Sequence, residues 1–326
     1  MTTAWSRAVV ESIEDATPHI RTVILRPLAG FVSYAPGSHI EIQVETGQRT
    51  ETRHYSLVGL PVGGRYRIAV KHSPDGLGGS RAMWRLAPGD HVTISQPKND
   101  FALSFGRADY LLIAGGIGIT PLLGMALALK QRGASFRLVY AARRQEDLAF
   151  AAELDAGLGG AWQSACSAAR GRIDVRQLLS TLDAAGEVYV CGPMTLLDAV
   201  KAEWSQLGRP LERLRFESFA SSGHFAAMPF EVELPRLRLK VSVGAHESMI
   251  DALARSGVAV MADCRRGECG LCALPVLSAT SPIDHRDVFL SEAERQQNAR
   301  ICACVSRAAG GTIVIDDGYR DRHDIL

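Results

Sequence analysis

The sequence predicts a multidomain protein with an antiparallel β-barrel, a doubly wound parallel α/β sheet and a small C-terminal unit built around a cysteine-rich loop. Three observations predict this fold class. Short β-branched segments separated by turn residues fill the first third, strands alternate with helices from Asp109 onward, and five of the seven cysteines lie in the last third. These changes in pattern place the expected units at 1–106, 107–221 and 230–326, with a linker at 222–229.

Composition narrows the class of protein. At 326 residues, with 47% hydrophobic and 22% charged residues, the chain can bury several cores. A formal net charge of +1 does not favour nucleic acid or a membrane surface as a partner. The N-terminal stretch lacks the pattern of a signal peptide, and no segment reaches the roughly 18 apolar residues of a membrane span. We therefore expect a cytoplasmic protein.

The first unit is expected to be a barrel because its strands are short and punctuated. Each is rich in β-branched residues and bounded by Gly, Pro, Asp or Asn. A short helix is predicted at 78–86. The predicted strands are 20–28, 37–44, 54–60, 66–72 and 91–97.

The middle unit alternates buried strands with helices, which predicts a parallel sheet. The predicted strands are 110–114, 136–142, 187–190 and 213–219, and the predicted helices are 119–133, 147–158, 174–184 and 196–208. The last unit is expected to contain a hairpin at 230–244, a helix at 248–257 and a closing strand at 312–317.

The cysteine-rich loop has the spacing C-x4-C-x2-C, formed by Cys264, Cys269 and Cys272, with Cys302 and Cys304 following about thirty residues later. This is the spacing of a plant-type [2Fe-2S] site. The loop glycines allow a tight turn that aims backbone N–H groups at the sulfurs. Structural zinc is the alternative, although it usually takes a second C-x2-C pair or histidines. A disulfide framework is typical of small secreted chains.

Two glycine-containing turns indicate a nucleotide site. The stretch 114–121 follows a buried strand and opens a helix, where glycines allow a pyrophosphate to approach the backbone. The stretch does not have the G-x-G-x-x-G pattern. The acidic residue that binds the ribose in proteins with that pattern is therefore not expected here. The second turn, 191–193, lies where another strand ends, at the edge where α/β sheets bind ligands. The alternative is a pair of ligand-free turns, with Cys191 a small buried filler.

The first unit contains two weaker motifs. Arg53, Tyr55 and Ser56 offer a cation, an aromatic face and a hydroxyl on one extended segment. Such a set can hold a phosphate, stack on a flat ring and hydrogen-bond to a ring nitrogen. The stretch 76–81 offers backbone amides with Ser80 and Arg81, which can take a terminal phosphate. Each motif alone is also compatible with ordinary structure.

The chain carries the motifs at 53–56, 115–121 and 191–193 and the cysteine-rich loop in this order, and with them it resembles the phthalate dioxygenase reductase family along nearly its whole length. Further similar stretches are 68–72, 216–219, 284–295 and 304–308. The resemblance implies a ferredoxin-reductase-type barrel, a nucleotide domain and a plant-type ferredoxin domain with a β-grasp fold. It also implies a cytoplasmic NADH-dependent oxidoreductase that holds FMN and a [2Fe-2S] cluster and serves a Rieske-type terminal oxygenase.

The resemblance also implies which residues hold the flavin. Arg53 would bind its phosphate side, and Tyr55 and Ser56 would lie along the isoalloxazine, with His54 at the variable position of the motif. No obvious place for an adenine follows Ser80, which favours FMN over FAD. The implied flavin residues are Arg53, His54, Tyr55, Ser56, Ala69, Val70, Lys71, Gly78, Gly79 and Ser80, with Phe219 as a shielding aromatic.

The implied NADH residues come from the two glycine-containing turns. Ser56, Thr120 and Cys191 would lie where nicotinamide and flavin meet, and Thr120 and Cys191 would orient the nicotinamide without reacting. The implied set is Gly115, Gly116, Gly118, Ile119, Thr120, Pro121, Cys191, Gly192 and Pro193. The charged turn at 143–147 offers arginines for a 2′-phosphate and acids for a free ribose, and the resemblance favours NADH.

The fourth iron ligand is either Cys302 or Cys304 by spacing. In the family the ligand precedes a serine by two residues, which here is Ser306, so the resemblance selects Cys304 together with Cys264, Cys269 and Cys272. Cys302 would then be a neighbouring thiol.

Three functions are compatible with these motifs. The first is a monomeric electron-transfer reductase that serves an oxygenase through a small transient interface. The second is a self-contained reductase of another acceptor, although no further substrate domain remains. The third is a ferredoxin-like binding module whose upstream domains have lost their ligands.

Overall fold

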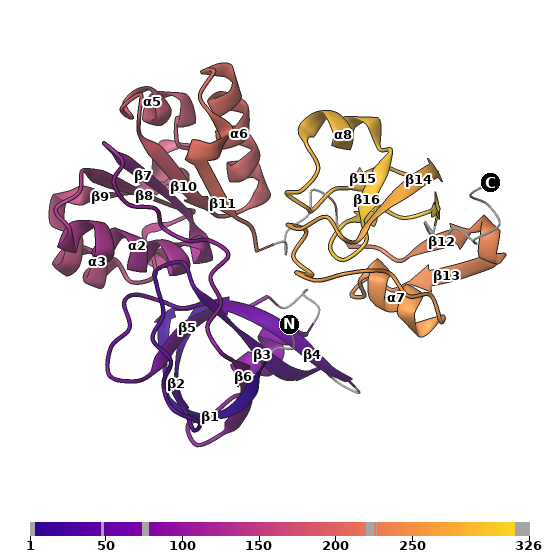
Figure 1. The fold of residues 1–326 in the computed structure, drawn as a ribbon, viewed down its shortest axis with the longest axis horizontal. Coiled ribbons are helices and arrows are strands. Elements are labelled where there is room, and N and C mark those ends of the chain that lie inside the picture. Colours follow the sequence, from indigo (N-terminus) through magenta and orange to yellow (C-terminus); the bar gives the residue numbers. More distant parts are fainter. Residues whose placement is uncertain (1–3, 47–48, 74–77, 220–224, 226, 317–326) are drawn as a thin grey trace. The chain divides into compact units, whose positions relative to one another are not determined.

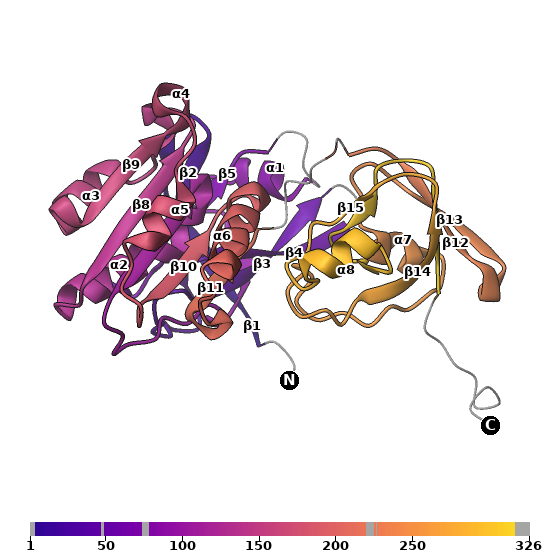
Figure 2. The same cartoon turned by 90° about the horizontal axis from the view of Figure 1, so that it is seen from above.

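The computed structural model describes residues 4–46, 49–73, 78–219, 225 and 227–316. The chain divides into two compact units, Met1–Glu217 and Ser218–Leu326, shown in indigo to magenta and in orange to yellow in Figures 1 and 2. Four of the eight residues of the predicted linker at 222–229, and the tail after residue 316, lie outside the described residues. The described part contains no helix with the length and apolar character needed to cross a bilayer.

A six-stranded antiparallel barrel forms the first part of the first unit. Its strand order is β4-β3-β6-β1-β2-β5, and a bridge between Leu57 and Ile68 connects the two outer strands. A short helix, α1, follows the fifth strand. The elements are β1 (Trp5–Thr17), β2 (Ile20–Pro27), β3 (His39–Thr46), β4 (Arg49–Ser56), β5 (Tyr66–Lys71), α1 (Gly79–Trp84) and β6 (His91–Ser95).

Side chains alternate between the two faces of each strand, and those that face inward fill the barrel. Ile40, Ile42 and Val44 of β3 are buried in its core, while the residues between them point to the opposite face. Two details differ from the sequence prediction. Strand β1 was not predicted, because a register shift between Val10 and Ser12 interrupts its alternation. Strand β4 ends at Ser56, several residues before the predicted end of that strand.

The second part of the first unit is a five-stranded parallel sheet in the order β11-β10-β7-β8-β9. Helices α2 and α3 pack together, as do α5 and α6, and Figure 1 shows these pairs on opposite faces of the sheet. The strands are β7 (Tyr110–Gly115), β8 (Phe136–Ala142), β9 (Trp162–Cys166), β10 (Glu187–Cys191) and β11 (Leu214–Glu217). The helices are α2 (Ile119–Gln131), α3 (Ala151–Leu158), α4 (Ser167–Arg170), α5 (Val175–Ser180) and α6 (Met194–Gln206).

The order of this sheet reverses between β7 and β10. From β7 the chain first adds β8 and β9 on one side, and then β10 and β11 on the other. The loops after β7 and β10 therefore leave the same edge in opposite directions, which is the topological switch point where open α/β sheets bind ligands. Strand β7 is buried at all six positions, as a central parallel strand requires.

The second unit has a five-stranded mixed sheet in the order β13-β12-β18-β14-β16, in which β12 and β18 run parallel. Helix α7 packs beside β13, as Figure 2 shows. The strands are β12 (Phe230–Leu234), β13 (Leu239–Val243), β14 (Ala273–Ala279), β16 (Arg300–Cys302) and β18 (Thr312–Ile315), with a separate pair, β15 (Ile283–Asp284) and β17 (Arg307–Ala308). The helices are α7 (Met249–Arg255) and α8 (Glu292–Gln297).

Five short 3-10 helices complete the described elements. They are η1 (Gly116–Gly118), η2 (Gln145–Asp147), η3 (Gly159–Ala161), η4 (Leu211–Arg213) and η5 (Pro235–Leu237).

A buried carboxylate anchors the segment that joins the barrel to the sheet. Glu187, at the start of β10, is fully buried and accepts hydrogen bonds from Ser104 Oγ, from Arg107 Nε at 3.0 Å and from Arg215 Nε at 3.1 Å. Burial opposes ionisation, but these hydrogen bonds outweigh it and hold the pKa of Glu187 below its usual value. The charge therefore stabilises the fold at neutral pH.

We expect Glu187→Gln to lower the free energy of unfolding of the first unit by about 2 kcal/mol at pH 7, because a buried charged acceptor is lost. The folded pKa is lowered, so the contribution of Glu187 is present above the unfolded pKa and is lost as pH falls through the folded pKa. Urea unfolding at several pH values should show the difference shrinking below about pH 4. The exposed Glu212→Gln is the control, and an equal effect of both variants would contradict this account.

Candidate functional site

The two predicted nucleotide turns meet at the switch point. Cys191 ends β10 and pairs with Ala114 of β7 on one side and with Glu217 of β11 on the other. Gly118 lies so close to this strand end that a Cβ atom there would overlap the Cys191 carbonyl oxygen and come within 2.9 Å of the Gly192 nitrogen. A side chain at position 118 would therefore force the two turns apart.

Helix α2 begins directly after Gly118 and runs for thirteen residues. No side chain caps its first turn, which also contains no charged residue. Because the positive end of the helix dipole lies directly after the glycine-containing turn Gly116–Gly118, this end of α2 is suitable for an anionic group. Ile119, Thr120 and Pro121 are buried in this turn, and Thr120 Oγ1 donates to the Ile117 carbonyl at 2.9 Å. The geometry fits the pyrophosphate of a dinucleotide.

The end of the flavin motif reaches this same edge. Ser56 is buried at the end of β4, and its Oγ donates to Glu217 Oε2 at 3.5 Å. Glu217 is 3% exposed and lies beside Cys191 in the sheet register. Three residues from three distant segments, Ser56, Cys191 and Glu217, therefore meet at one place. Sequence reasoning noted the stretch 216–219 but did not single out Glu217, whose signal was a charge at the end of a strand.

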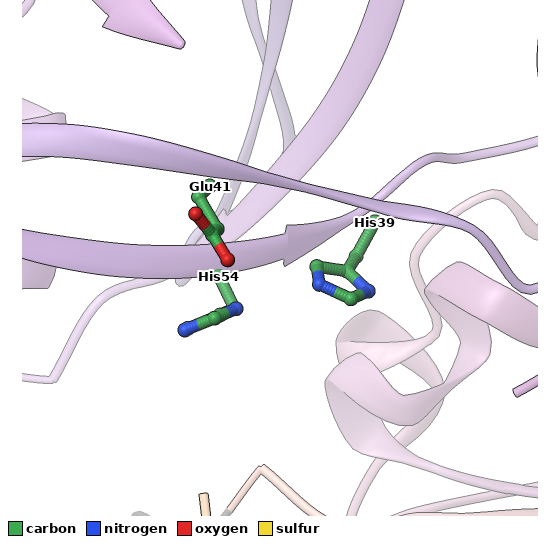
Figure 3. A group of neighbouring side chains, drawn as sticks. All are labelled: His39, Glu41 and His54. Atoms are coloured by element: carbon green, nitrogen blue, oxygen red, sulfur yellow. The ribbon is translucent and has the colours of Figure 1, made fainter. Parts of the chain in front are cut away.

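Strand alternation separates the residues of the flavin motif. Arg53 and Tyr55 share one face of β4, while His54 and Ser56 share the other. Tyr55 packs against the barrel core, and burial raises the pKa of its phenol. His54 lies instead beside His39 and Glu41 of the neighbouring strand, as Figure 3 shows. It shares its face of the strand with Ser56, and Arg53 and Tyr55 lie on the opposite face.

A cationic group and a tight turn lie side by side next to β4. Gly79 packs directly against the Arg53 side chain, whose guanidinium pairs with Glu51 and donates to the Thr52 carbonyl at 3.1 Å. A guanidinium beside a glycine turn fits a phosphate group. The Ser80 hydroxyl is engaged with Ser73, accepting from its N–H at 3.2 Å and donating to its carbonyl at 3.1 Å.

Strand β5 carries the remaining predicted flavin residues. Ala69 and Val70 are buried, and Lys71 is exposed. Trp84 Nε1 donates to the Val70 carbonyl at 3.1 Å, which ties α1, with Gly78 before it, to this strand. Phe219, the predicted shield of the flavin, is partly buried and belongs to the second compact unit.

The cysteines of the second unit converge from three segments. Cys264 and Cys269 lie in the loop after α7, Cys272 lies just before β14, and Cys304 follows β16. The Sγ atoms of Cys272 and Cys304 are 3.1 Å apart. The thiol Sγ of Cys264 accepts hydrogen bonds from the Arg266 and Cys269 N–H groups, each at 3.4 Å. Backbone donors directed at sulfur, with a soft donor set, fit an iron–sulfur cluster.

Both candidates for the fourth ligand lie next to Cys272. Hydrogen bonds from the thiols of Cys302 and Cys304 lower the pKa of Cys272. Cys302 is fully buried, whereas Cys304 is 8% exposed and also accepts from the Gly267 N–H of the cysteine loop. Gly267 has a φ of +74°, and a Cβ atom there would lie 2.8 Å from Asp287 Cα. This contact with the loop favours Cys304, and the choice remains a prediction.

A buried polar network supports the cysteine loop. Asp287 accepts from Ser306 Oγ at 2.8 Å and from the Leu290 N–H at 2.9 Å, while the neighbouring Val288 N–H donates to the Gly267 carbonyl at 2.9 Å. This network joins the segment after Cys304 to the loop that holds Cys264 and Cys269. The sequence showed the residues but not their mutual contacts.

Comparisons with known proteins agree with the nucleotide site and with the cysteine site described above. Residues 112–202 match the family model described as "Oxidoreductase NAD-binding domain", and residues 234–309 match "2Fe-2S iron-sulfur cluster binding domain". The chain is 37% identical to the heme-dependent oxidative N-demethylase beta subunit of Ectopseudomonas mendocina, over 94% of this chain and 97% of that protein.

Solved structures give the same result. The structure of phthalate dioxygenase reductase, described as modular for electron transfer from pyridine nucleotides to [2Fe-2S], is 31% identical with a TM-score of 0.75, covering 96% of this chain and 98% of that one. An intact type IV self-sufficient cytochrome P450 monooxygenase is 30% identical with a TM-score of 0.66 over 95% of this chain. This chain spans only 41% of that monooxygenase.

These likenesses extend over nearly the whole chain and include both cofactor-binding domains. They confirm the predicted fold class of barrel, parallel α/β sheet and [2Fe-2S] domain. The protein is an oxidoreductase whose cofactors are NADH, FMN and a [2Fe-2S] cluster. The chain belongs to the phthalate dioxygenase reductase family.

Proposed function

We propose that this chain delivers electrons from NADH to the Rieske-type terminal oxygenase of a two-component system. One observation carries the proposal. A single chain combines a sheet edge suited to a dinucleotide, a flavin motif next to that edge and a cysteine-rich loop suited to a [2Fe-2S] cluster. The meeting of Ser56 with Glu217 beside Cys191 supports direct contact between flavin and nicotinamide. The four cysteines support a [2Fe-2S] cluster from which single electrons would leave the protein.

The chemistry requires paired electrons to be separated. When bound, FMN supplies this step, because it accepts two electrons together as hydride and releases them singly to a cluster. The protein binds and orients the cofactors. Arg53 with Gly78 and Gly79 would hold the flavin phosphate, and Tyr55 would support its ring. Ala69, Val70, Lys71 and Ser80 would form the adjoining wall.

The residues at the sheet edge would position the coenzyme. Gly115, Gly116 and Gly118 would admit the pyrophosphate at the start of α2, and Cys191 with Gly192 and Pro193 would border the nicotinamide. Thr120 would orient the nicotinamide from the buried first turn of α2. No residue here would need to act as a general base or nucleophile, because the bound cofactors would supply the redox chemistry.

The cluster would be held by Cys264, Cys269, Cys272 and Cys304. The backbone N–H groups directed at these sulfurs would stabilise negative charge on the cluster and so tune its potential. Phe219 would shield the flavin until the nicotinamide binds. The three cofactor domains would be residues 1–106, 107–221 and 230–326, with 222–229 as a linker.

A haem-dependent oxygenase is the second candidate partner. The 37% identity with a subunit of a heme-dependent oxidative N-demethylase favours it, as does the likeness to a self-sufficient cytochrome P450. Either centre accepts single electrons, so the reductase chemistry is the same. We further propose that the protein is a cytoplasmic monomer, because reduced thiolates and a transient electron-transfer interface suit that setting.

The proposal is tested by adding NADH anaerobically to the purified protein and then supplying an acceptor. We expect flavin and cluster absorption to bleach. We also expect a purified Rieske oxygenase to be reduced faster than an oxygenase whose active site contains haem. Bleaching without transfer to either oxygenase would contradict an oxygenase partner. A cluster that does not respond to NADH would contradict the electron-transfer role altogether.

Gly118→Ala should slow flavin reduction by NADH about 100-fold, because the added methyl group displaces the Cys191 turn and a shift of about 1 Å misaligns the reacting rings. Stopped-flow absorbance at saturating NADH measures this rate. Gly160→Ala is the matched control, since it adds a methyl group in open space at ordinary backbone angles. Unchanged flavin reduction in Gly118→Ala would disprove the assignment of this turn.

Cys304→Ser and Cys302→Ser separate the two candidate ligands. We expect Cys304→Ser to lose the cluster and Cys302→Ser to retain it, because the Gly267 N–H of the cysteine loop is directed at Cys304. Iron and sulfide analysis with electron paramagnetic resonance of the reduced protein measures the outcome. The reverse pattern, iron lost only in Cys302→Ser, would make Cys302 the ligand.

A further inference from the structure

The barrel carries a group of metal-ligating side chains that the electron-transfer chemistry does not use. His39 and Glu41 come from β3 and His54 from β4, and one ligand atom from each lies within 4.8 Å of the others. Figure 3 shows the three side chains pointing toward one another across the two strands. Three potential metal ligands therefore converge on one side of the barrel.

The strand register brings these residues together. Glu41 lies directly opposite His54 in the antiparallel pair, and His39 is two residues before Glu41, so all three share one face. The imidazole rings of His39 and His54 have centroids 5.3 Å apart. Paired strands position the ligands more rigidly than a loop does, so the convergence belongs to the folded barrel.

The surroundings suit a cation. His39 is 2% exposed and the Glu41 side chain is 12% exposed, so the ligands are largely shielded from water. Lys98 Nζ pairs with Glu41 Oε1 at 2.6 Å, so a bound metal would share this carboxylate with the ammonium group. The Asp100 carboxylate lies 3.9 Å from His39 Nε2 and adds a second negative charge nearby.

We propose that His39, Glu41 and His54 form a binding site for a divalent transition metal of the zinc class. Two imidazoles and one carboxylate are a ligand set that zinc uses where it keeps a fourth position open. Zinc bonds of about 2.0–2.1 Å require ligand atoms about 3.3 Å apart, so side-chain adjustments of about 1.5 Å or less would close the group. Water or Asp100 supplies the fourth ligand.

The site gives His54 a role different from flavin binding. Because β4 also carries Arg53 and Tyr55 on its other face, a metal held between His54 and β3 fixes the strand on which the flavin residues lie. Metal binding should therefore stabilise the barrel by an amount that rises with the logarithm of the metal concentration above the Kd.

The test uses the protein with FMN and its cluster in place, so that the four cysteines proposed to hold the cluster are occupied. After treatment with a mild chelator, Zn²⁺ binding is measured by equilibrium dialysis, and X-ray absorption at the zinc edge reports the ligands. We expect one equivalent of zinc with nitrogen and oxygen neighbours at about 2.0–2.1 Å and no sulfur at about 2.3 Å. We expect His54→Gln, His39→Gln and Glu41→Gln each to raise the Kd at least about tenfold.

His91→Gln is the matched control, because His91 is an exposed histidine of the same barrel. Zinc that is not retained, zinc with sulfur neighbours, or equal Kd values for His54→Gln and His91→Gln would each overturn the proposal. The absorption measurement on the unmodified protein keeps the test decisive even if a variant folds poorly.

Discussion

The close packing of two strand ends, β7 and β10, is the constraint on which the nucleotide site depends. Their pairing places Cys191 beside Ala114, and the turns that follow can approach only because Gly118 has no side chain. The reversal of strand order at this point opens the edge of the sheet, where the positive end of the α2 dipole lies. Glu217 at the end of β11 then brings Ser56 of the barrel to the same edge.

The second unit meets a different requirement, which is to collect thiolates and keep them stable. The cysteines lie in a partly buried site, where the iron ions of the cluster compensate thiolate charge and backbone N–H groups donate hydrogen bonds to sulfur. Asp287 and Ser306 hold the polypeptide around the loop in the shape that directs those donors. The protein therefore combines one site that binds an exchangeable coenzyme with another that is built permanently around metal.

Several local features were not evident from the sequence for identifiable reasons. The shifted alternation of β1 concealed a thirteen-residue strand. Strand β9 was not predicted because it is a polar strand at the edge of the sheet, and it exists through pairing with β8 rather than through its own pattern. Glu217 and the group of His39, Glu41 and His54 depend on register between segments, and no local pattern predicts register across such separations.

The fold class, the cysteine spacing and the family could all be predicted from the amino-acid sequence. Each of these depends on local periodicity or on short motifs in a fixed order. The folded chain was needed to show that Ser56, Cys191 and Glu217 meet and that His54 lies on the opposite face of β4 from Arg53 and Tyr55. It was also needed to show that Cys302 and Cys304 both interact with Cys272. The physical reason is that strand order and strand register arise from packing between distant segments, which the neighbours of a residue in sequence do not encode.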